Sequence, residues 1–349
     1  IGREHELQQL QEALYRTIHQ QKLQLLTIVG DAGIGKSRLL YEFEKWIDPL
    51  PETVLYFKGR ADQQMRYAPY ALMRDLISYR LEIQDSDAPQ VARHKIETAF
   101  ATILGENGLE KAHFIGQLLG FDFSESPYIR GVLDDTRQIR DRAFFYIGQF
   151  FAAATRANPV LILLEDIHWA DDNSLDLVEH LARHVPEYPV LILALTRTNL
   201  FEHRPAWKER YPLVALNALT REESSRLVQE ILRLVPTIPS ILQETVIINA
   251  AGNPFYMEEL IKMMIENGVI MPGAEVWRVH PGRLAEVQVP PTLTGVLQAR
   301  LDRLSLPERE LLQRASVVGR IFWDGAVTYL TQEEPEQPGE PVNEGLTAL

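Results

Sequence analysis

Two kinds of hydrophobic pattern alternate along residues 1–216 of the chain. Nearly continuous apolar runs occupy 23–29, 160–164 and 190–195, and a shorter run occupies 54–57. Runs of this length, bounded by polar residues or proline, are typical of strands buried in a parallel sheet. Between them, apolar residues recur at the spacing of amphipathic helices. Strands that alternate with helices predict an α/β fold, with a mostly parallel sheet flanked by helices.

Polar residues directly follow the predicted strands. Glu165 and Asp166 follow the run at 160–164, and Thr196 and Arg197 follow the run at 190–195. In parallel α/β sheets, ligands bind beyond the carboxyl ends of the strands. We therefore expect these side chains to line one site.

The strand pattern stops after about Leu216, and the remaining chain is predicted to be mainly helical. Thr220 with Glu223 forms a capping box that starts one helix. Ser305 with Glu308 forms a second capping box that starts another.

Three further segments of this part are expected to interrupt the helices. Residues 252–254, Gly-Asn-Pro, predict a tight joint between two helices. A short hairpin is expected over 269–279. The acidic, Pro- and Gly-rich stretch 331–343 predicts a loop.

Composition narrows the class of protein. Apolar residues make up 46% of the 349 residues and charged residues 24%, as in folded globular proteins. The chain has no cysteine, which excludes disulfides, thiolate metal sites and cysteine nucleophiles and suits a cytoplasmic protein.

No apolar run approaches the roughly 20 residues that cross a membrane, and no signal-peptide pattern is present. Because the sequence starts at Ile1 without an initiator methionine, we expect it to be part of a longer protein.

Residues 30–37 match the phosphate-binding loop pattern in full, and they lie between a predicted strand and a predicted helix. Glycines in such a loop let backbone N–H groups and the helix N-terminus face an anion. The lysine is expected to bridge the β and γ phosphates of a nucleotide, and the serine hydroxyl to bind Mg²⁺. An ordinary Gly-rich turn is the alternative. The candidate nucleotide-binding residues of this segment are Gly30, Asp31, Ala32, Gly33, Ile34, Gly35, Lys36, Ser37 and Arg38.

The acids after the run at 160–164 are candidates for the second part of such a site. A buried strand can deliver carboxylates beside the metal ion of a nucleotide. By position we assign Glu165 to Mg²⁺ and Asp166 to polarising the attacking water, and the reverse assignment stays open. Solvated loop acids are the alternative.

Thr196 and Arg197 are expected close to the γ-phosphate of a bound nucleotide. A guanidinium there can distinguish ATP from ADP through bidentate contact with phosphate oxygens. The alternative is a surface arginine that happens to follow a strand. Lys36, Glu165, Asp166 and Arg197 form the candidate catalytic set.

The histidines near these motifs are assigned to structure. His168 and Trp169 directly follow the two acids, and packing of that loop is their expected role. His180 and His184 are four residues apart on a predicted helix, but no third metal ligand is evident. A solvated helix face is therefore favoured for that pair.

Together these motifs resemble the signal-transduction ATPases with numerous domains (STAND), within the AAA-like P-loop superfamily and close to the origin-recognition-like AAA module. The resemblance covers nearly the whole chain. The segments that carry it are 1–4, 30–37, 164–171, 196–197 and 252–255, with Glu258 and Glu259. The segment 113–120 further resembles bacterial proteins in which this module follows a class III adenylate or guanylate cyclase domain and precedes helical repeats.

The resemblance implies three domains. A P-loop nucleotide-binding domain is expected over 1–216, with a helical insertion at about 75–140. A helical domain with a short hairpin is expected over 217–290. The start of a winged helix, cut before it finishes, is expected over 291–349.

The resemblance also implies an ATP-driven switch with ATP or ADP and Mg²⁺ as cofactors. ADP would hold the domains closed, and exchange for ATP would open them for assembly or effector activation. Gly2 and Arg3 would lie near the adenine, Arg197 would sense the γ-phosphate, and Pro254 would close over the nucleotide. Many relatives have Asp where this chain has Glu165, which leaves the metal geometry and the hydrolysis rate open.

The expected partners are ATP, attached effector and sensor domains of the same longer chain, and further copies of the chain in a nucleotide-dependent homo-oligomer. A nucleotide cyclase domain and helical repeats are candidates for the attached domains, and no membrane contact is expected. A trans-acting arginine could come from Arg137, Arg140 or Arg142.

Other classes of protein share the loop. A DNA-associated initiator ATPase is disfavoured by charge, because the whole chain has a net charge of −13 and residues 291–349 carry five Arg and no Lys against nine acids. A small-molecule kinase is disfavoured because no acceptor site is visible and the helical extension would have no use. A GTPase is less favoured still, because no Asn-Lys-x-Asp motif for guanine occurs.

Overall fold

A computed structural model describes the chain except for residues 185–186, 285–288, 319–321 and 333–349. The chain divides into two compact units, Ile1–Ala218 and Leu219–Leu349. The division lies two residues after the boundary that the sequence predicts at 216. No helix among the described residues is long and apolar enough to span a bilayer.

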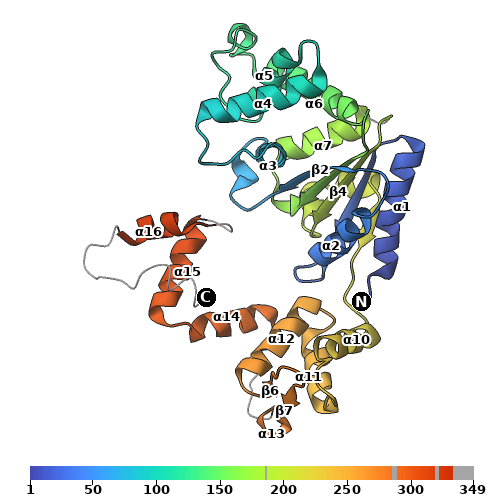
Figure 1. The fold of residues 1–349 in the computed structure, drawn as a ribbon, viewed down its shortest axis with the longest axis vertical. Coiled ribbons are helices and arrows are strands. Elements are labelled where there is room, and N and C mark those ends of the chain that lie inside the picture. The colour runs from blue at the N-terminus through green and yellow to red at the C-terminus, as the bar shows by residue number, and fades with distance from the viewer. Residues whose placement is uncertain (185–186, 285–288, 319–321, 333–349) are drawn as a thin grey trace. The chain divides into compact units, whose positions relative to one another are not determined.

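The first unit is built on a five-stranded sheet in the order β2-β3-β4-β1-β5, in which all neighbouring strands are parallel (Figure 1). The strands are β1 (Gln24–Val29), β2 (Leu55–Arg60), β3 (Val160–Glu165), β4 (Val190–Thr196) and β5 (Leu213–Ala215). The predicted α/β fold with a parallel sheet is therefore confirmed. The sequence pattern did not identify β5.

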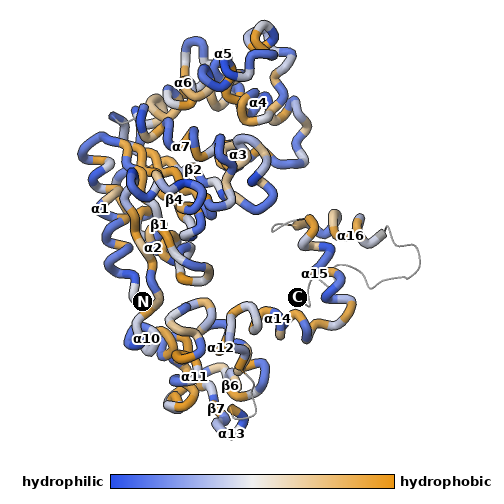
Figure 2. The backbone as a smooth tube through the Cα atoms, turned by 180° about the vertical axis from the view of Figure 1, so that it is seen from behind, coloured by the Kyte–Doolittle hydropathy of each residue, from blue (hydrophilic) through white to orange (hydrophobic). Residues whose placement is uncertain are grey.

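One face of the sheet is covered by α1 (Glu4–Gln20) and α2 (Lys36–Ile47). Leu14 of α1 and Phe43 of α2 are fully buried there with the inward side chains of the central strands. Every residue of β4 is buried. Figure 2 shows the strands of the sheet mainly in hydrophobic colours. The continuous apolar runs in the sequence therefore arise because the central strands are packed on both faces.

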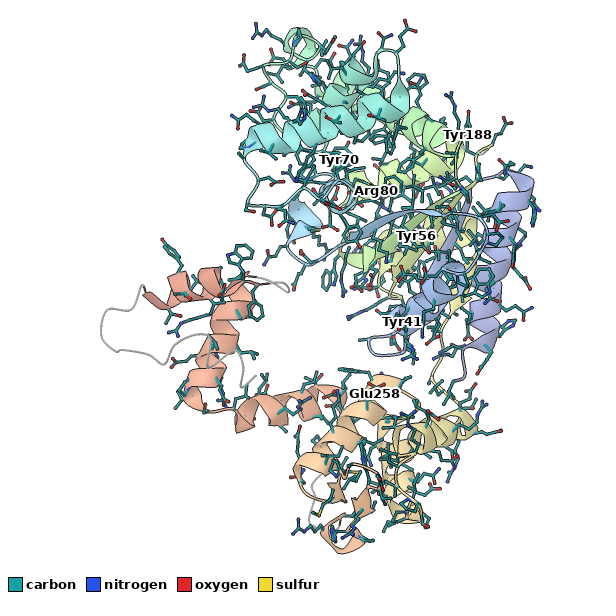
Figure 3. All side chains as sticks on the ribbon, viewed as in Figure 1. Tyr41, Tyr56, Tyr70, Arg80, Tyr188 and Glu258 are labelled. Atoms are coloured by element: carbon teal, nitrogen blue, oxygen red, sulfur yellow. The ribbon has the colours of Figure 1, made fainter. Side chains whose placement is uncertain are left out.

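Helices also cover the opposite face. Phe57 of β2 contacts Phe150 and Phe151 edge to face, and Tyr70 (labelled in Figure 3) is buried on the same side. The backbone N–H of Tyr70 donates to the carboxylate of Asp171 at 2.8 Å. The helices of this layer are α3 (Ala71–Arg80), α4 (Pro89–Leu104), α5 (Gly108–Leu118), α6 (Thr136–Ala154) and α7 (Asp172–His184). The insertion limits expected at 75 and 140 fall inside α3 and α6.

Short helical segments complete the first unit. They are η1 (Met65–Tyr67), η2 (Arg130–Val132), η3 (Ile167–Trp169), α8 (Leu200–His203) and α9 (Pro205–Arg210). The η3 turn follows the carboxyl end of β3 and carries the residues directly after the two acids.

The second unit is mainly helical and has its own core. Its elements are α10 (Arg221–Ile231), α11 (Ser240–Ala250), α12 (Pro254–Glu266), β6 (Ile270–Met271), β7 (Arg278–Val279), α13 (Pro281–Leu284), α14 (Leu293–Arg303), α15 (Leu306–Val318) and α16 (Asp324–Gln332). The capping box of Thr220 and Glu223 is formed at the start of α10. β6 and β7 pair antiparallel, as the predicted hairpin requires.

The end of the chain differs from the expectation in one place. Residues 331–332 belong to α16, so the predicted loop does not begin at Thr331; the rest of that stretch lies outside the described residues. From 291 onward, the described part of the chain contains three helices and no strand. The winged helix therefore stays a prediction.

Candidate functional site

The loop between β1 and α2 has the backbone conformations for which its glycines are suited. Gly33 and Gly35 have φ angles of +74° and +103°, in the left-handed region where a side chain is strained. Gly35 is the N-cap of α2, so the helix begins at Lys36 directly after the loop. The N–H groups in the first turn of a helix have no intrahelical acceptor, and they are therefore free to bind an anion.

Gly30 holds the base of this loop against two other segments. Its N–H donates to the carbonyl of Thr196 at 3.2 Å. A Cβ atom at this position would lie 2.8 Å from Cγ2 of Ile34 and 3.0 Å from the carbonyl oxygen of Leu216. Any larger residue would therefore displace Ile34 of the loop or the segment after β5.

Lys36 is held inside the loop by backbone carbonyls. Its Nζ donates to the carbonyl oxygens of Gly30 at 2.6 Å and Asp31 at 2.9 Å. Burial lowers its pKa, and the nearby Arg197 lowers it further, while Asp166 and Asp31 oppose the shift. The ammonium is thus positioned by the loop and lies within the electrostatic reach of residues that end β3 and β4.

Of the remaining loop candidates, Ile34 is buried and the others lie at the surface. Asp31 and Ala32 are exposed, as are Ser37 and Arg38 in the first turn of α2. The guanidinium of Arg38 pairs with Glu42 one turn further along at 2.6 Å. The predicted role of Arg38 in binding nucleotide would require it to leave this ion pair.

The two acids lie at the carboxyl end of β3, as expected, and both face an arginine that the sequence analysis missed. Arg60 ends the neighbouring strand β2, in register with Glu165. Its Nη2 lies 2.6 Å from Oδ2 of Asp166 and its Nη1 lies 3.7 Å from Oε2 of Glu165. No local pattern singled out Arg60, because the apolar run of β2 ends at Phe57, three residues before it.

Glu165 and Asp166 differ in environment. Burial raises the pKa of Glu165, Asp166 and Glu44 raise it further, and Arg60 and Lys58 oppose the shift. Asp166 has a φ of +54°, and backbone in this region is strained for most residues but tolerated by Asp. Both carboxyl groups still face Arg60, and the division of roles between them stays a prediction.

The end of β4 places Thr196 and Arg197 beside the loop. Thr196 is fully buried, and its hydroxyl donates to the carbonyl of Arg197 at 3.0 Å. Arg197 is exposed, and its guanidinium makes no hydrogen bond or ion pair within the described parts of the chain. It still acts electrostatically on Lys36 and on His168.

His168 is buried, with 6% of its surface exposed. Burial lowers its pKa to about 4, Arg197 and Lys36 lower it further, and Asp166 opposes the shift. The ring is therefore neutral at pH 7. Its centroid lies 5.1 Å from that of the Trp169 ring, so the two side chains pack as the sequence analysis expected.

The segment before α1 also reaches the loop. Nη2 of Arg3 donates to the carbonyl oxygens of Ile34 at 3.1 Å and Asn217 at 2.6 Å, and its Nη1 pairs with Glu6 at 3.2 Å. Gly2 has a φ of +70°. Arg3 therefore connects the phosphate-binding loop to the end of the first unit. The contact with adenine expected for Gly2 and Arg3 stays a prediction.

Pro254 belongs to the second unit. It is the first residue of α12, where its missing N–H costs nothing, and the side chain of Asn253 accepts a hydrogen bond from the N–H of Tyr256 at 3.1 Å. The predicted joint between two helices is thus formed. The closure of Pro254 over a nucleotide stays a prediction.

The side chains at the loop fit Mg²⁺ only as part of a nucleotide complex. The described residues contain no group of three or more His, Asp or Glu side chains that could hold a metal ion. Mg²⁺ usually keeps several waters and is bound through one or two carboxylates together with substrate phosphates. Glu165 or Asp166 and the hydroxyl of Ser37 are suitable for that partial coordination.

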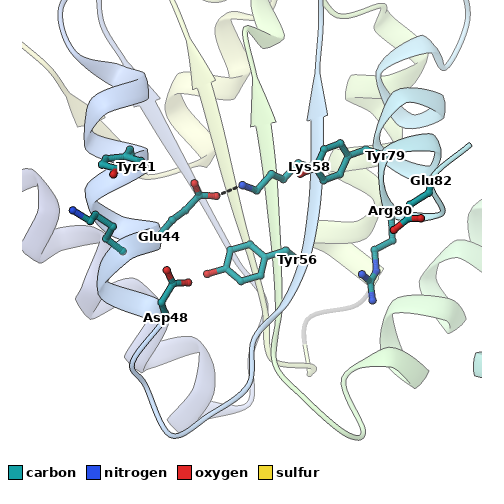
Figure 4. Close-up of a pocket in the computed structure, with 9 residues that line it drawn as sticks. Tyr41, Glu44, Asp48, Tyr56, Lys58, Tyr79, Arg80 and Glu82 are labelled. Atoms are coloured by element: carbon teal, nitrogen blue, oxygen red, sulfur yellow. Dashed lines mark ion pairs between the residues drawn. The ribbon is translucent and has the colours of Figure 1, made fainter. Parts of the chain in front are cut away.

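A groove of about 660 Å³ lies beside α2, β2 and the end of α3, and none of residues 30–37 lines it (Figure 4). Lys58 of β2 forms an ion pair with Glu44 of α2 in this groove. Burial, with Asp48 and Glu44 nearby, raises the pKa of Tyr56 to about 12. Because Lys58 and Glu44 also act on Glu165, the groove is electrostatically coupled to the acids of the site.

A phosphate-binding loop on β1, acids on β3 and a cation on β4, gathered at the carboxyl edge of one parallel sheet, define a P-loop nucleotide-binding fold. Residues 1–193 match the AAA ATPase domain family. The chain belongs to this family, and the prediction of an AAA-like P-loop ATPase is confirmed. The finer assignment to the STAND class and to cyclase-linked proteins stays a prediction.

One curated relative aligns with most of the chain. The uncharacterized protein R02095 of Rhizobium meliloti (strain 1021) is 25% identical over 334 residues, which is 91% of this chain and 29% of the relative. The chain therefore spans less than a third of the length of that protein.

Solved structures of origin-recognition proteins are similar in fold. The Aeropyrum pernix ORC1 protein in complex with DNA has a TM-score of 0.44 and 12% identity, over 99% of this chain and 81% of that chain. Drosophila ORC bound to DNA has a TM-score of 0.47 and 13% identity, over 99% of this chain and 78% of that chain. Similarity at this level carries no information on function.

Proposed function

We propose that this chain binds ATP and hydrolyses it slowly, as a nucleotide-dependent switch. The observation that carries the proposal is the convergence of Lys36, Asp166 and Arg197. They come from α2, from the end of β3 and from the end of β4, yet both Asp166 and Arg197 act electrostatically on Lys36. Two cations and a carboxylate around one loop suit a phosphate group and its metal ion.

Each residue of the site has a role in this proposal. Lys36 leaves its two backbone carbonyls and bridges the β and γ phosphates. Ser37 and Glu165 hold Mg²⁺, and Asp166 polarises the attacking water; exchange of the two acids is the alternative. Mg²⁺ held there would supply positive charge to the phosphates during transfer.

Arg197 is the proposed sensor of the γ-phosphate. Its guanidinium makes no competing ion pair among the described residues, so contact with a phosphate would cost no protein interaction. Thr196, fully buried, fixes the backbone from which Arg197 projects. Gly2 and Arg3 are proposed to lie near the adenine, which the contact of Arg3 with the loop residue Ile34 supports.

The proposed output is a rearrangement of the two units between ADP and ATP states that regulates an attached effector. Two features support it: the chain divides into two compact units, and it spans 29% of a longer relative that has room for other domains. A nucleotide cyclase domain, helical repeats and a nucleotide-dependent homo-oligomer are the proposed partners.

An origin-recognition-like ATPase that acts on DNA is the second candidate. The acidic net charge of −13 opposes it, because DNA binding requires a basic surface. Retention of duplex DNA at about 150 mM salt would favour this second candidate over the switch.

Hydrolysis of ATP by the purified chain tests the proposal. With enzyme in excess over labelled ATP, the wild-type chain should release phosphate even if turnover is slow. The Lys36→Ala variant should lose nucleotide binding, because the removed ammonium is the cation held at the phosphate position.

The Lys45→Ala variant is the matched control. It removes an exposed lysine from the same helix, outside the loop, and should bind ATP as the wild type does. Retained ATP affinity in Lys36→Ala would contradict the proposal. Equal competition by GTP would contradict the preference for adenine.

A further inference from the structure

The side chain of His168 is buried without a hydrogen-bond partner. Only 6% of its surface is exposed, and neither Nδ1 nor Nε2 has a partner among the described residues. Buried polar groups in native proteins almost always have partners, so a ring with two unpaired nitrogens needs an explanation.

The position of the ring connects it to the nucleotide site. His168 lies in η3, two residues after Asp166. The charged groups that act on the ring are Arg197, Asp166 and Lys36, and these belong to three different elements of the site. The η3 turn also contacts β4, so the ring lies beside the end of β4 and within electrostatic reach of the loop and the acids.

The two nitrogens have opposite requirements. A neutral imidazole offers one N–H donor and one acceptor. A phosphate oxygen only accepts, so it could pair only with the ring N–H. The unprotonated nitrogen needs a donor, and a water molecule is the partner at a nucleotide site that can supply one.

We propose that His168 positions the attacking water during ATP hydrolysis, together with the acid that polarises it. The inference rests on the proposed function. In the step, the water oxygen bonds to the γ-phosphorus, the bond from phosphorus to the bridging oxygen breaks, and ADP leaves with that electron pair. The proton lost by the water passes to the acid and ends on the released phosphate.

Packing alone does not account for a histidine here. An aromatic hydrocarbon ring of similar size would fill the same space without burying two unpaired nitrogens, so it would leave the fold at least as stable. Phenylalanine therefore separates the two roles, because it keeps the packing and removes the hydrogen bonds.

The experiment compares His168→Phe and His168→Gln with the wild-type full chain under single-turnover conditions. For His168→Phe we expect a thermal midpoint equal to or above that of the nucleotide-free wild type. Its ADP affinity should stay within about threefold, and its hydrolysis rate should fall by about tenfold to a hundredfold. His168→Gln keeps one donor and one acceptor and should recover most of the rate.

Each contrary result is informative. Hydrolysis by His168→Phe at the wild-type rate overturns the inference, as does an equal loss of ADP and ATP affinity. A marked fall in its thermal midpoint would show that the ring nitrogens are satisfied within the protein. A wild-type chain that binds ATP without hydrolysing it also overturns the inference, whereas a wild-type chain that fails to bind ATP shows that the proposed function itself is wrong.

Discussion

Two arginines at the carboxyl edge of the sheet have opposite environments. Arg60 contacts both acids of β3, whereas Arg197 makes no ion pair in the described parts of the chain. A cation that is already paired stabilises the acids in place, while an unpaired one is available to a ligand. At the scale of single residues, this difference assigns Arg60 to the acids and Arg197 to the phosphate.

Replacement of Arg197 by Ala should weaken ATP binding more than ADP binding. A charge-assisted hydrogen bond contributes about 1.5–3 kcal/mol, which corresponds to roughly tenfold to a hundredfold in affinity. ADP affinity should change by less than about threefold. Calorimetric titration of both nucleotides measures the difference, and equal losses would show that Arg197 does not sense the third phosphate.

At the scale of elements, the turn that joins β1 to α2 depends on backbone freedom. Gly35 has a φ of +103°, and no atom lies within 4 Å of where its Cβ would be. A side chain at this position would therefore meet no steric neighbour but would strain the backbone. Gly30 differs, because a side chain there would collide with Ile34 and Leu216.

The Gly35→Ala variant should be destabilised by about 1–2 kcal/mol, and its nucleotide affinity should fall because the loop relaxes. Urea unfolding and ADP titration measure the two effects. Gly131→Ala is the matched control, since Gly131 has open space and no positive φ. If both variants unfold at the same urea concentration, the positive φ at Gly35 does not make glycine necessary there for the stability of the fold.

The second unit contains a buried carboxylate that joins two of its helices. Glu259 of α12 is 2% exposed and lies 2.8 Å from Lys262 and 2.6 Å from Arg300 of α14. Burial alone would raise its pKa, but the bonds from Lys262 and Arg300 outweigh that effect and lower the pKa from the usual value of a glutamate. An acid with a lowered pKa stabilises the fold above its unfolded pKa, and this stability is lost as pH falls through the folded pKa.

The Glu259→Gln variant should therefore be less stable than the wild type at pH 7 by about 1–3 kcal/mol. The gap should narrow as pH falls from the usual pKa of a glutamate through the lowered pKa of the folded protein, where the native carboxyl takes up a proton. Denaturant unfolding from pH 7 to pH 3 measures it, with Glu258→Gln at the exposed neighbouring position as control. A gap that is constant with pH would contradict this role of the ion pair.

The sequence predicted the central strands closely because these are packed on both faces. β1, β3 and β4 each differ from their predicted ranges by one residue at a single end. β2 is only partly buried, so its apolar run ends at Phe57 while the strand continues to Arg60. β5 has three residues, too few for a hydrophobic period.

The loop, the acids and Arg197 could be found from the sequence because each directly follows a strand. The pairing of Arg60 with the acids depends on the register between β2 and β3, which no local pattern specifies. The unpaired nitrogens of His168 depend on which side chains surround the ring, and this is a property of the tertiary structure. From the sequence, only a packing role could be predicted for His168.

At the scale of the whole molecule, the proposed switch depends on nucleotide bound to the first unit. The loop, Lys36, the two acids and Arg197 all belong to Ile1–Ala218, while Pro254 belongs to the second unit. A switch that rearranges these units needs a nucleotide that stays bound long enough to define a resting state. ADP is the expected resting ligand.

The most direct test is to denature the freshly purified protein and identify the released nucleotide by chromatography. Lys36→Ala, purified in parallel, should release none. We predict ADP in a near-stoichiometric amount from the wild type. A wild-type protein that releases no nucleotide and binds neither added ADP nor added ATP would contradict the account.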